Sequence, residues 1–417
     1  MVDLKPPKRV RRIMPSFLNS EAPIAGDFKS TGGGIATISS RHHDLDALRA
    51  IVMLLGIVLH ASYAFTAGTW AVQDVRQNDA FSLINIAIHG FRMPLFFVMS
   101  GFFTAMLWRK RGLRALVQHR FRRVFLPLLL GVFTIIPLTR FVWDFAAASA
   151  TDISAKAGIV AFINDFSFTH LWFLWQLCLL VAGFAIIAWL IDHFSFPRLP
   201  NWVVLSPVRY LWLVPLTMIP QAFMKDASMA EFGPDTSIGL FPAPSILAFY
   251  CIFFCFGALY YDYDDPEGRI SHGWKMALPL GLFVLFPLGV AIIYFIEDYP
   301  LLGNFVQAAF AWVMVFGLMG LFHKFFSGEN NTMRYVSDSS YWVYLAHLPL
   351  IIMAQYVISE WPIPAVVKFT LICVVVTGFL LYTYHFLVRY TWMGTFLNGS
   401  RKRPEEEPAQ SLAQGAD

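Results

Sequence analysis

Long apolar blocks set the fold class of this chain. A stretch of about 20 mostly apolar residues can cross a bilayer as a helix. Such blocks lie at residues 46–66, 85–107, 124–144, 168–191, 208–224, 244–262, 275–296, 303–323, 334–358 and 364–388. Charged residues form only 14% of the 417 residues, against about 25% in an average soluble domain. The sequence therefore predicts an all-α integral membrane protein with ten transmembrane helices, and not a membrane β-barrel, whose strands alternate in polarity over about ten residues.

Lysine and arginine are distributed unevenly between the predicted loops. When alternate loops are grouped with the termini, 24 of the 31 fall on one side, many of them in the tail at 1–45 and the basic loop at 108–123. Positively charged loops stay in the cytoplasm, so we expect both termini to be cytoplasmic. We also expect the tails at 1–45 and 391–417 to be disordered and the membrane domain to span 46–390. The formal net charge of +4 does not indicate nucleic-acid binding.

The first block carries a polar stripe. Arg49 and His60 are eleven residues apart, which places them on one helix face, about 16 Å apart along the axis. Asp46 shares this face, and Gly56 leaves room for something thin to lie along the helix. A charged side chain at mid-membrane costs roughly 2.5–3.5 kcal/mol, so it tends to face the protein interior and mark function. Alternatively, Arg49 snorkels to the headgroups and His60 is a core histidine bonded to a backbone carbonyl.

The second block supplies further polar residues. It carries His89 and Arg92 in the half predicted to be outer, and Ser100 before Gly101. Counting along the two antiparallel helices puts His60 and Arg92 at a common depth. Ser100 is either a polar contact or a mark of close packing, because small residues let membrane helices approach each other.

Two later blocks add candidates of different kinds. Tyr344 and His347 share a helix face in a run that is too polar for a lipid-facing helix. Trp172 and Trp175 open the fourth block, where they are either interface-belt residues or a stacking platform for a sugar. No His or acidic pair has a recognisable zinc spacing, and we expect neither a metal nor a bound prosthetic group.

Five segments in order resemble the acyltransferase 3 family of multi-spanning membrane acyltransferases. These segments are residues 45–60, 91–103, 120–127, 170–174 and 341–347. Residues 89–101, 170–174 and the Thr69-Trp70 pair are most similar to the branch that succinylates osmoregulated periplasmic glucans. The resemblance implies a ten-helix bundle in the bacterial inner membrane. It also implies cytoplasmic succinyl-CoA as acyl donor and co-substrate, and a periplasmic glucan as acceptor.

The same resemblance suggests roles for individual residues. His60 would take the proton from a glucan hydroxyl or carry the acyl group covalently. Arg92 would stabilise an oxyanion or neutralise the free carboxylate of a succinyl group. Donor phosphates would be held by Arg49, Arg120, Arg122 and Arg123, since guanidinium binds phosphate bidentately. The supporting polar residues would be Asp46, Ser100, Tyr344 and His347, and the acceptor-binding residues Trp70, Trp172 and Trp175.

Two other functions stay open at this point. The first is acetyl transfer to another envelope polysaccharide, which needs no cation for the acyl group. The second is transport of a glycan or acylated substrate, because intramembrane arginine and histidine also occur in transporters. The sequence does not indicate the oligomeric state.

Overall fold

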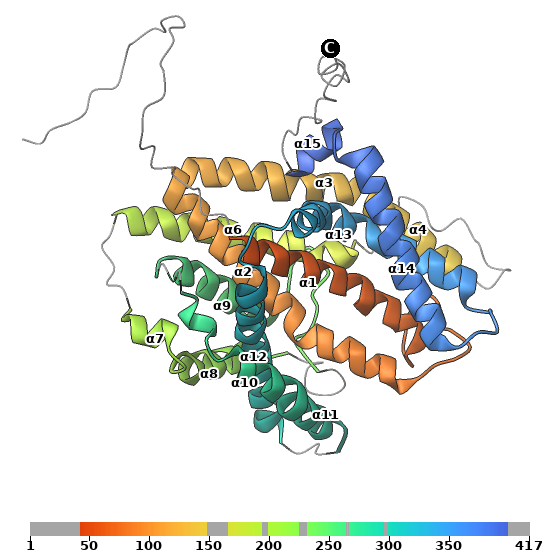
Figure 1. The fold of residues 1–417 in the computed structure, drawn as a ribbon, viewed down its shortest axis with the longest axis horizontal. Helices are drawn as coiled ribbons and strands as arrows, with labels where there is room; N and C mark the ends of the chain where they lie inside the picture. The colour runs from red at the N-terminus through yellow and green to blue at the C-terminus, as the bar shows by residue number, and fades with distance from the viewer. Residues whose placement is uncertain are drawn as a thin grey trace, which may run out of the picture. The chain divides into compact units, whose positions relative to one another are not determined.

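The part of the chain described by the structure, a computed structural model, is built from helices. It comprises residues 42–147, 166–193, 199–224, 232–263, 265, 267–295 and 299–398. Contacts separate residues 1–41 from residues 42–417, and all described residues lie in the second unit. Within them there is no strand (Figure 1), and eight helical segments are long and apolar enough to cross a membrane. The prediction of an all-helical fold is thereby confirmed for the described residues, and the eight segments are consistent with a membrane protein.

The helices follow the predicted apolar blocks closely. They are α1 (His43–Ser62), α2 (Asp79–Arg120), α3 (Leu126–Phe133), α4 (Ile135–Ala147), α6 (Trp172–His193), α7 (Asn201–Leu205), α8 (Arg209–Gln221), α9 (Pro244–Tyr261), α10 (Trp274–Leu280), α11 (Phe286–Phe295), α12 (Pro300–Phe326), α13 (Asn331–Ile358), α14 (Ala365–Thr383) and α15 (Trp392–Asn398). Of the predicted tails, only residues 42–45 and 391–398 are described. The second of these segments contains α15.

The number of membrane crossings stays a prediction, as does the side on which the termini lie. Two predicted blocks, 85–107 and 124–144, fall within one helical segment of 69 residues, Asp79–Ala147, which is kinked at Gly112. The predicted block 208–224, which is interrupted by Pro215 and Pro220, contains α8, which has 13 residues. Such a helix is about 20 Å long, which is shorter than a hydrocarbon core of about 30 Å.

The predicted basic loop at 108–123 is helical instead. Helix α2 continues to Arg120 and passes into a π-helical turn at Phe121–Phe125 before α3 begins. Gly112, with a φ of 79° and a ψ of 170° that glycine adopts without steric penalty, forms a kink that divides α2 into two helices. The prediction of a loop over residues 108–123 was wrong, because lysine, arginine, leucine and alanine are strong helix formers, and only the kink at Gly112 breaks the helix within it.

Close backbone packing joins α2 to α9. A Cβ atom added at Gly101 would lie 1.9 Å from the carbonyl oxygen of Phe254, and one added at Gly257 would lie 1.9 Å from the carbonyl oxygen of Val98. The two glycines therefore allow each helix to approach the backbone of the other, as small residues do in membrane proteins. This contact fixes the part of α2 that carries Arg92.

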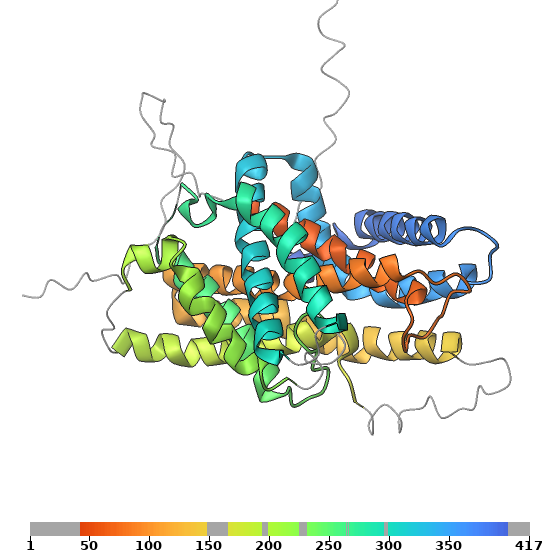
Figure 2. The ribbon, with the colours of Figure 1, turned by 90° about the horizontal axis from the view of Figure 1, so that it is seen from below.

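Helix α1 lies against α13, α2, α12 and α14, and α12 lies beside α10 in both views (Figures 1 and 2). The loop that follows α1 is fixed by a buried ion pair. Lys368 on α14 donates from Nζ to Oδ2 of Asp74 at 2.8 Å and to the Ser359 carbonyl at 2.5 Å. Both charged side chains are almost inaccessible, with 0% and 2% exposure. The loop carrying Trp70 is therefore anchored at its far end.

Candidate active site

A cavity of about 700 Å³ lies between the ends of several helices. Its walls include His60 of α1, Arg92 of α2, Trp143 of α4, His170 of the 3-10 turn Thr169–Leu171, and His347 of α13. Thus His60 and Arg92, expected at one depth from counting alone, line the same cavity.

The Arg92 guanidinium has few partners. Its Nε and Nη1 atoms are buried without a hydrogen bond, and Nη2 reaches only the Met93 sulfur, at 3.6 Å. No carboxylate among the described residues forms an ion pair with it. A Cβ atom on Gly56 would lie 2.9 Å from Nη1, so the space expected for a thin ligand along α1 is taken by this guanidinium. A buried cation without a counter-ion is unfavourable, and the site favours an anion beside it.

Four histidines line the cavity. His89 is bonded through Nε2 to the Pro234 carbonyl at 2.9 Å, and the other three lie close together and differ in their hydrogen bonds. The ring centroids of His60 and His347 are 5.2 Å apart, and those of His347 and His170 are 5.1 Å apart. His170 uses both ring nitrogens, with Nε2 3.1 Å from the Leu345 carbonyl and Nδ1 3.4 Å from the Thr169 hydroxyl. These two bonds give His170 a structural role and leave neither ring nitrogen for the reaction.

His347 keeps one nitrogen free. Its Nδ1 lies 2.7 Å from the Tyr344 carbonyl, and a carbonyl only accepts, so this nitrogen carries the proton. The Nε2 of a neutral His347 is then an acceptor, and it is buried without a partner. The Nδ1 of His60 is likewise buried without a partner. His60 is half-buried whereas His347 is only 3% exposed, so His60 is the more accessible of the two from the cavity.

Aromatic rings cover His60 on one side. Trp70 lies parallel to its ring at 6.1 Å and to the Tyr63 ring at 4.7 Å, and Trp143 meets Trp70 edge-on at 4.9 Å. Gln355 of α13, which is 1% exposed, accepts a hydrogen bond from the Trp70 indole at 2.8 Å and donates to the His60 carbonyl at 3.0 Å. The rings of Tyr63, Trp70 and Trp143 form an aromatic platform beside His60. The Gln355 side chain thus holds both this platform and the backbone of His60.

The predicted donor-binding arginines lie toward the other end of α1. Arg49 donates to the Ser337 hydroxyl at 3.0 Å and pairs with Asp46 at 3.2 Å, as its spacing suggested. Arg120 donates to the Thr104 hydroxyl at 2.8 Å and keeps a buried Nε without a partner. Arg122 is exposed and Arg123 is half-buried. None of these residues lines the cavity that contains His60.

The remaining candidates fall in different places. Tyr344 lines the cavity and donates to the His170 carbonyl at 2.9 Å. Trp172 lines it as well, but is only 8% exposed. Trp175 lies outside the lining, with its indole bonded to the Leu240 carbonyl at 2.9 Å. Ser100, which is half-buried, is likewise not part of this cavity, and its carbonyl accepts from Thr104.

Sequence reasoning missed three residues of the site: His170, Trp143 and Gln355. His170 stood inside a segment that resembled the family, so its signal was present but was assigned to neighbouring tryptophans. Trp143 and Gln355 carried no signal, because each reaches the site through helix packing between distant segments.

Comparison with known proteins shows the family of the chain. A family model described as an acyltransferase domain matches residues 42–397. The chain belongs to the acyltransferase 3 family. This acyltransferase is 26% identical over 388 residues to the Glucans biosynthesis protein C of Salmonella paratyphi B and to that of Salmonella dublin, covering 88% of the chain and 97% of each relative. The protein of that name from Salmonella paratyphi A is 25% identical over the same length. No solved structure matches the chain.

The family and these relatives confirm the resemblance found in the sequence and support acyl transfer as the activity. The helices long enough to cross a membrane agree with a membrane-embedded enzyme.

Proposed function

We propose that this acyltransferase moves a succinyl group from cytoplasmic succinyl-CoA to sugar hydroxyls of periplasmic glucans, across the bacterial inner membrane. One observation carries the proposal: the unpaired guanidinium of Arg92 and the free nitrogens of His60 and His347 line one cavity beside an aromatic platform. The name of the relatives supports a glucan as the acceptor class.

Arg92 is the group that favours a succinyl donor. A succinyl thioester ends in a free carboxylate, which is unfavourable in a dry site unless a cation pairs with it. Arg92 offers two buried nitrogens without partners, and charge-assisted bonds between guanidinium and carboxylate are strong. An acetyl group has no carboxylate and would leave this cation uncompensated.

His60 is the proposed general base. A sugar hydroxyl would attack the thioester carbonyl, so that a carbon–oxygen bond forms and the carbon–sulfur bond breaks. The hydroxyl proton would pass to neutral His60 and from there to the departing thiolate. A two-step route through acyl-histidine uses the same residue. His347 would position His60 or relay its proton.

Donor and acceptor would enter from opposite ends of α1. Arg49, Arg120, Arg122 and Arg123 would hold the phosphates of coenzyme A, about 16 Å of helix away from His60. Because the Arg92 guanidinium fills the space beside Gly56, the thioester arm would reach His60 past Arg92 and not through that space. The aromatic platform of Trp70, together with Trp172, would contact the sugar. Trp175 is proposed only as a support for the neighbouring turn, since its indole is bonded to the backbone.

Arg92→Gln in purified protein in lipid vesicles tests the acyl group. Initial rates are measured with glucan acceptor and either succinyl-CoA or acetyl-CoA. Loss of a charge-assisted bond should lower succinyl transfer roughly 10- to 100-fold and lower acetyl transfer far less. Arg334→Gln, which removes an exposed arginine paired with Glu329, is the matched control and should leave both rates unchanged.

Equal losses for both donors would show that Arg92 stabilises the oxyanion and not the succinyl carboxylate. Acetyl transfer by the wild type without succinyl transfer would overturn the succinyl assignment.

A further inference from the structure

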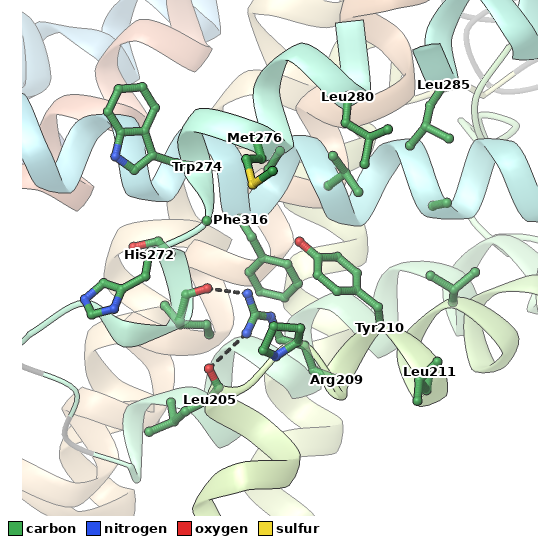
Figure 3. A pocket seen from close by; sticks show the side chains of 18 of the residues that line it. Leu205, Arg209, Tyr210, Leu211, His272, Trp274, Met276, Leu280, Leu285 and Phe316 are labelled. Carbon is green, nitrogen blue, oxygen red and sulfur yellow. Dashed lines mark hydrogen bonds between the residues drawn. The ribbon is translucent and has the colours of Figure 1, made fainter.

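A second hollow lies apart from the candidate active site. It is a groove of about 920 Å³ between α8, α10 and α12, and it shares no lining residue with the cavity that contains His60. Figure 3 shows Arg209 and the Phe316 ring at one end, with Leu280 and Leu285 toward the other. The groove is therefore polar at one end and apolar along its length.

Arg209 is the polar anchor of this groove. It is 5% exposed, donates from Nη1 to the Leu205 carbonyl at 3.0 Å and from Nη2 to the Ile270 carbonyl, and lies 4.2 Å from the Phe316 ring centroid (Figure 3). Its Nε is buried without a partner. Neutral carbonyls orient the guanidinium, and no carboxylate among the described residues forms an ion pair with it.

The carboxylates near this end of the groove bond to other groups. Arg269 pairs with Glu267 at 2.9 Å. The carboxylate of Asp265 accepts bonds from the backbone N–H groups of Arg269 and Ile270, and it acts on Arg209 only through space. An anionic group in the groove would therefore meet Arg209, whose guanidinium has no ion pair among the described residues.

The rest of the groove has an exposed apolar rim. Leu211 and Met276 on its rim are 76% and 81% exposed, and Phe305 is 47% exposed. Such exposure of large apolar side chains fits contact with lipid. From Phe316 to Phe305 the α12 wall extends over about 16 Å, which is long enough to hold much of an acyl chain.

We infer that this groove binds one anionic phospholipid of the surrounding bilayer. Its phosphate lies at Arg209, and one acyl chain lies along α12 toward Phe305. Free phosphate would pair with Arg209 but leave the apolar length empty, whereas a phospholipid matches both. The inference does not depend on the acyl-transfer reaction.

Native mass spectrometry of the full-length protein, released from bilayer discs of phosphatidylcholine with a minor share of phosphatidylglycerol, tests this. The wild type should retain phosphatidylglycerol well above its share of the lipid. Arg209→Gln keeps donors for the carbonyls but removes the charge, and should lower that enrichment about fivefold, as expected for one cation at a membrane surface. Ala277→Phe fills the groove and should remove the retained lipid with every charge in place.

Lys324→Gln is the matched control, because it removes an exposed cation from the same end of α12 outside the groove, and it should behave as the wild type. Retention of phosphatidylglycerol and phosphatidylcholine in proportion to their abundance would overturn the inference. So would unchanged enrichment in Ala277→Phe, which decides the matter if Arg209→Gln fails to fold. Displacement of the bound species by inorganic phosphate would show an anion site that needs no lipid.

Discussion

At the scale of single residues, hydrogen bonds separate the histidines that could do chemistry from the one that could not. His170 is fully bonded, whereas His347 presents a fixed acceptor nitrogen within the same cluster as His60. A buried acceptor without a partner is unfavourable. A proton donor that approaches the His347 Nε2 atom during the reaction would supply this missing partner.

His347→Ala should therefore slow acyl transfer by about 100-fold, within the range of a general acid–base group or its partner. The Michaelis constant for the donor should change little, because His347 is remote from the basic residues proposed to hold the phosphates. His170→Ala, the comparison variant, should act mainly by lowering the unfolding temperature, since it removes bonds to Leu345 and Thr169. Full activity in His347→Ala would exclude a role in proton transfer.

Gly56 tests whether the place of the Arg92 guanidinium matters. A methyl group there would lie 2.9 Å from Nη1, and the far end of a flexible side chain can give way. Gly56→Ala should therefore keep the unfolding temperature within a few degrees while lowering succinyl transfer about tenfold. Gly183→Ala on α6 adds the same methyl where nothing lies within 4 Å and should be neutral. An unchanged rate in Gly56→Ala would mean that the position of Arg92 is not critical.

Part of this residue-scale picture could be predicted from the sequence. The common level of His60 and Arg92 follows from helical rise and antiparallel counting. The filling of the Gly56 space by Arg92 does not, because it depends on the rotation of α2 against α1. Trp143 contacts Trp70, and Gln355 bonds to Trp70 and to the His60 carbonyl. These contacts join helices that are far apart in the chain, so residue spacing does not predict them.

At the scale of elements, the apolar blocks predicted the helices well but not their ends. Block 85–107 becomes part of α2, Asp79–Arg120, which continues beyond a kink at Gly112 because helix propensity persists through the basic residues after the apolar run stops. Hydrophobicity predicts which residues lie in the membrane, but it does not predict where the backbone hydrogen bonds of the helix end. The reciprocal contact of Gly101 and Gly257 likewise required the α2–α9 pairing to be known.

The loop after α1 depends on Lys368 and Asp74. Lys368→Met leaves a buried carboxylate without its cation, and breaking a buried ion pair costs about 3–5 kcal/mol. We expect a clear fall in the unfolding temperature and in acyl transfer, because Trp70 lies on this loop. The double variant Lys368→Met with Asp74→Asn should recover part of the stability. Equal stability of Lys368→Met and the wild type would show that the pair does not fix the loop.

At the scale of the whole molecule, the arrangement places two kinds of site at two ends of α1. Arginines gather near Asp46, while histidines and aromatic rings gather near His60. This separation is what transfer across a membrane requires, and the positive-inside distribution predicts which end faces the cytoplasm. A transporter would need the separation too, but it would not consume succinyl-CoA.

The most direct test is mass spectrometry of periplasmic glucans from cells that lack this protein. The cells are complemented with the wild type or with His60→Ala, and both proteins are quantified in the membrane. The proposal predicts succinyl mass increments on the glucans only with the wild type. Glucans that are the same in all three strains, or full succinylation with His60→Ala at normal protein level, would contradict it.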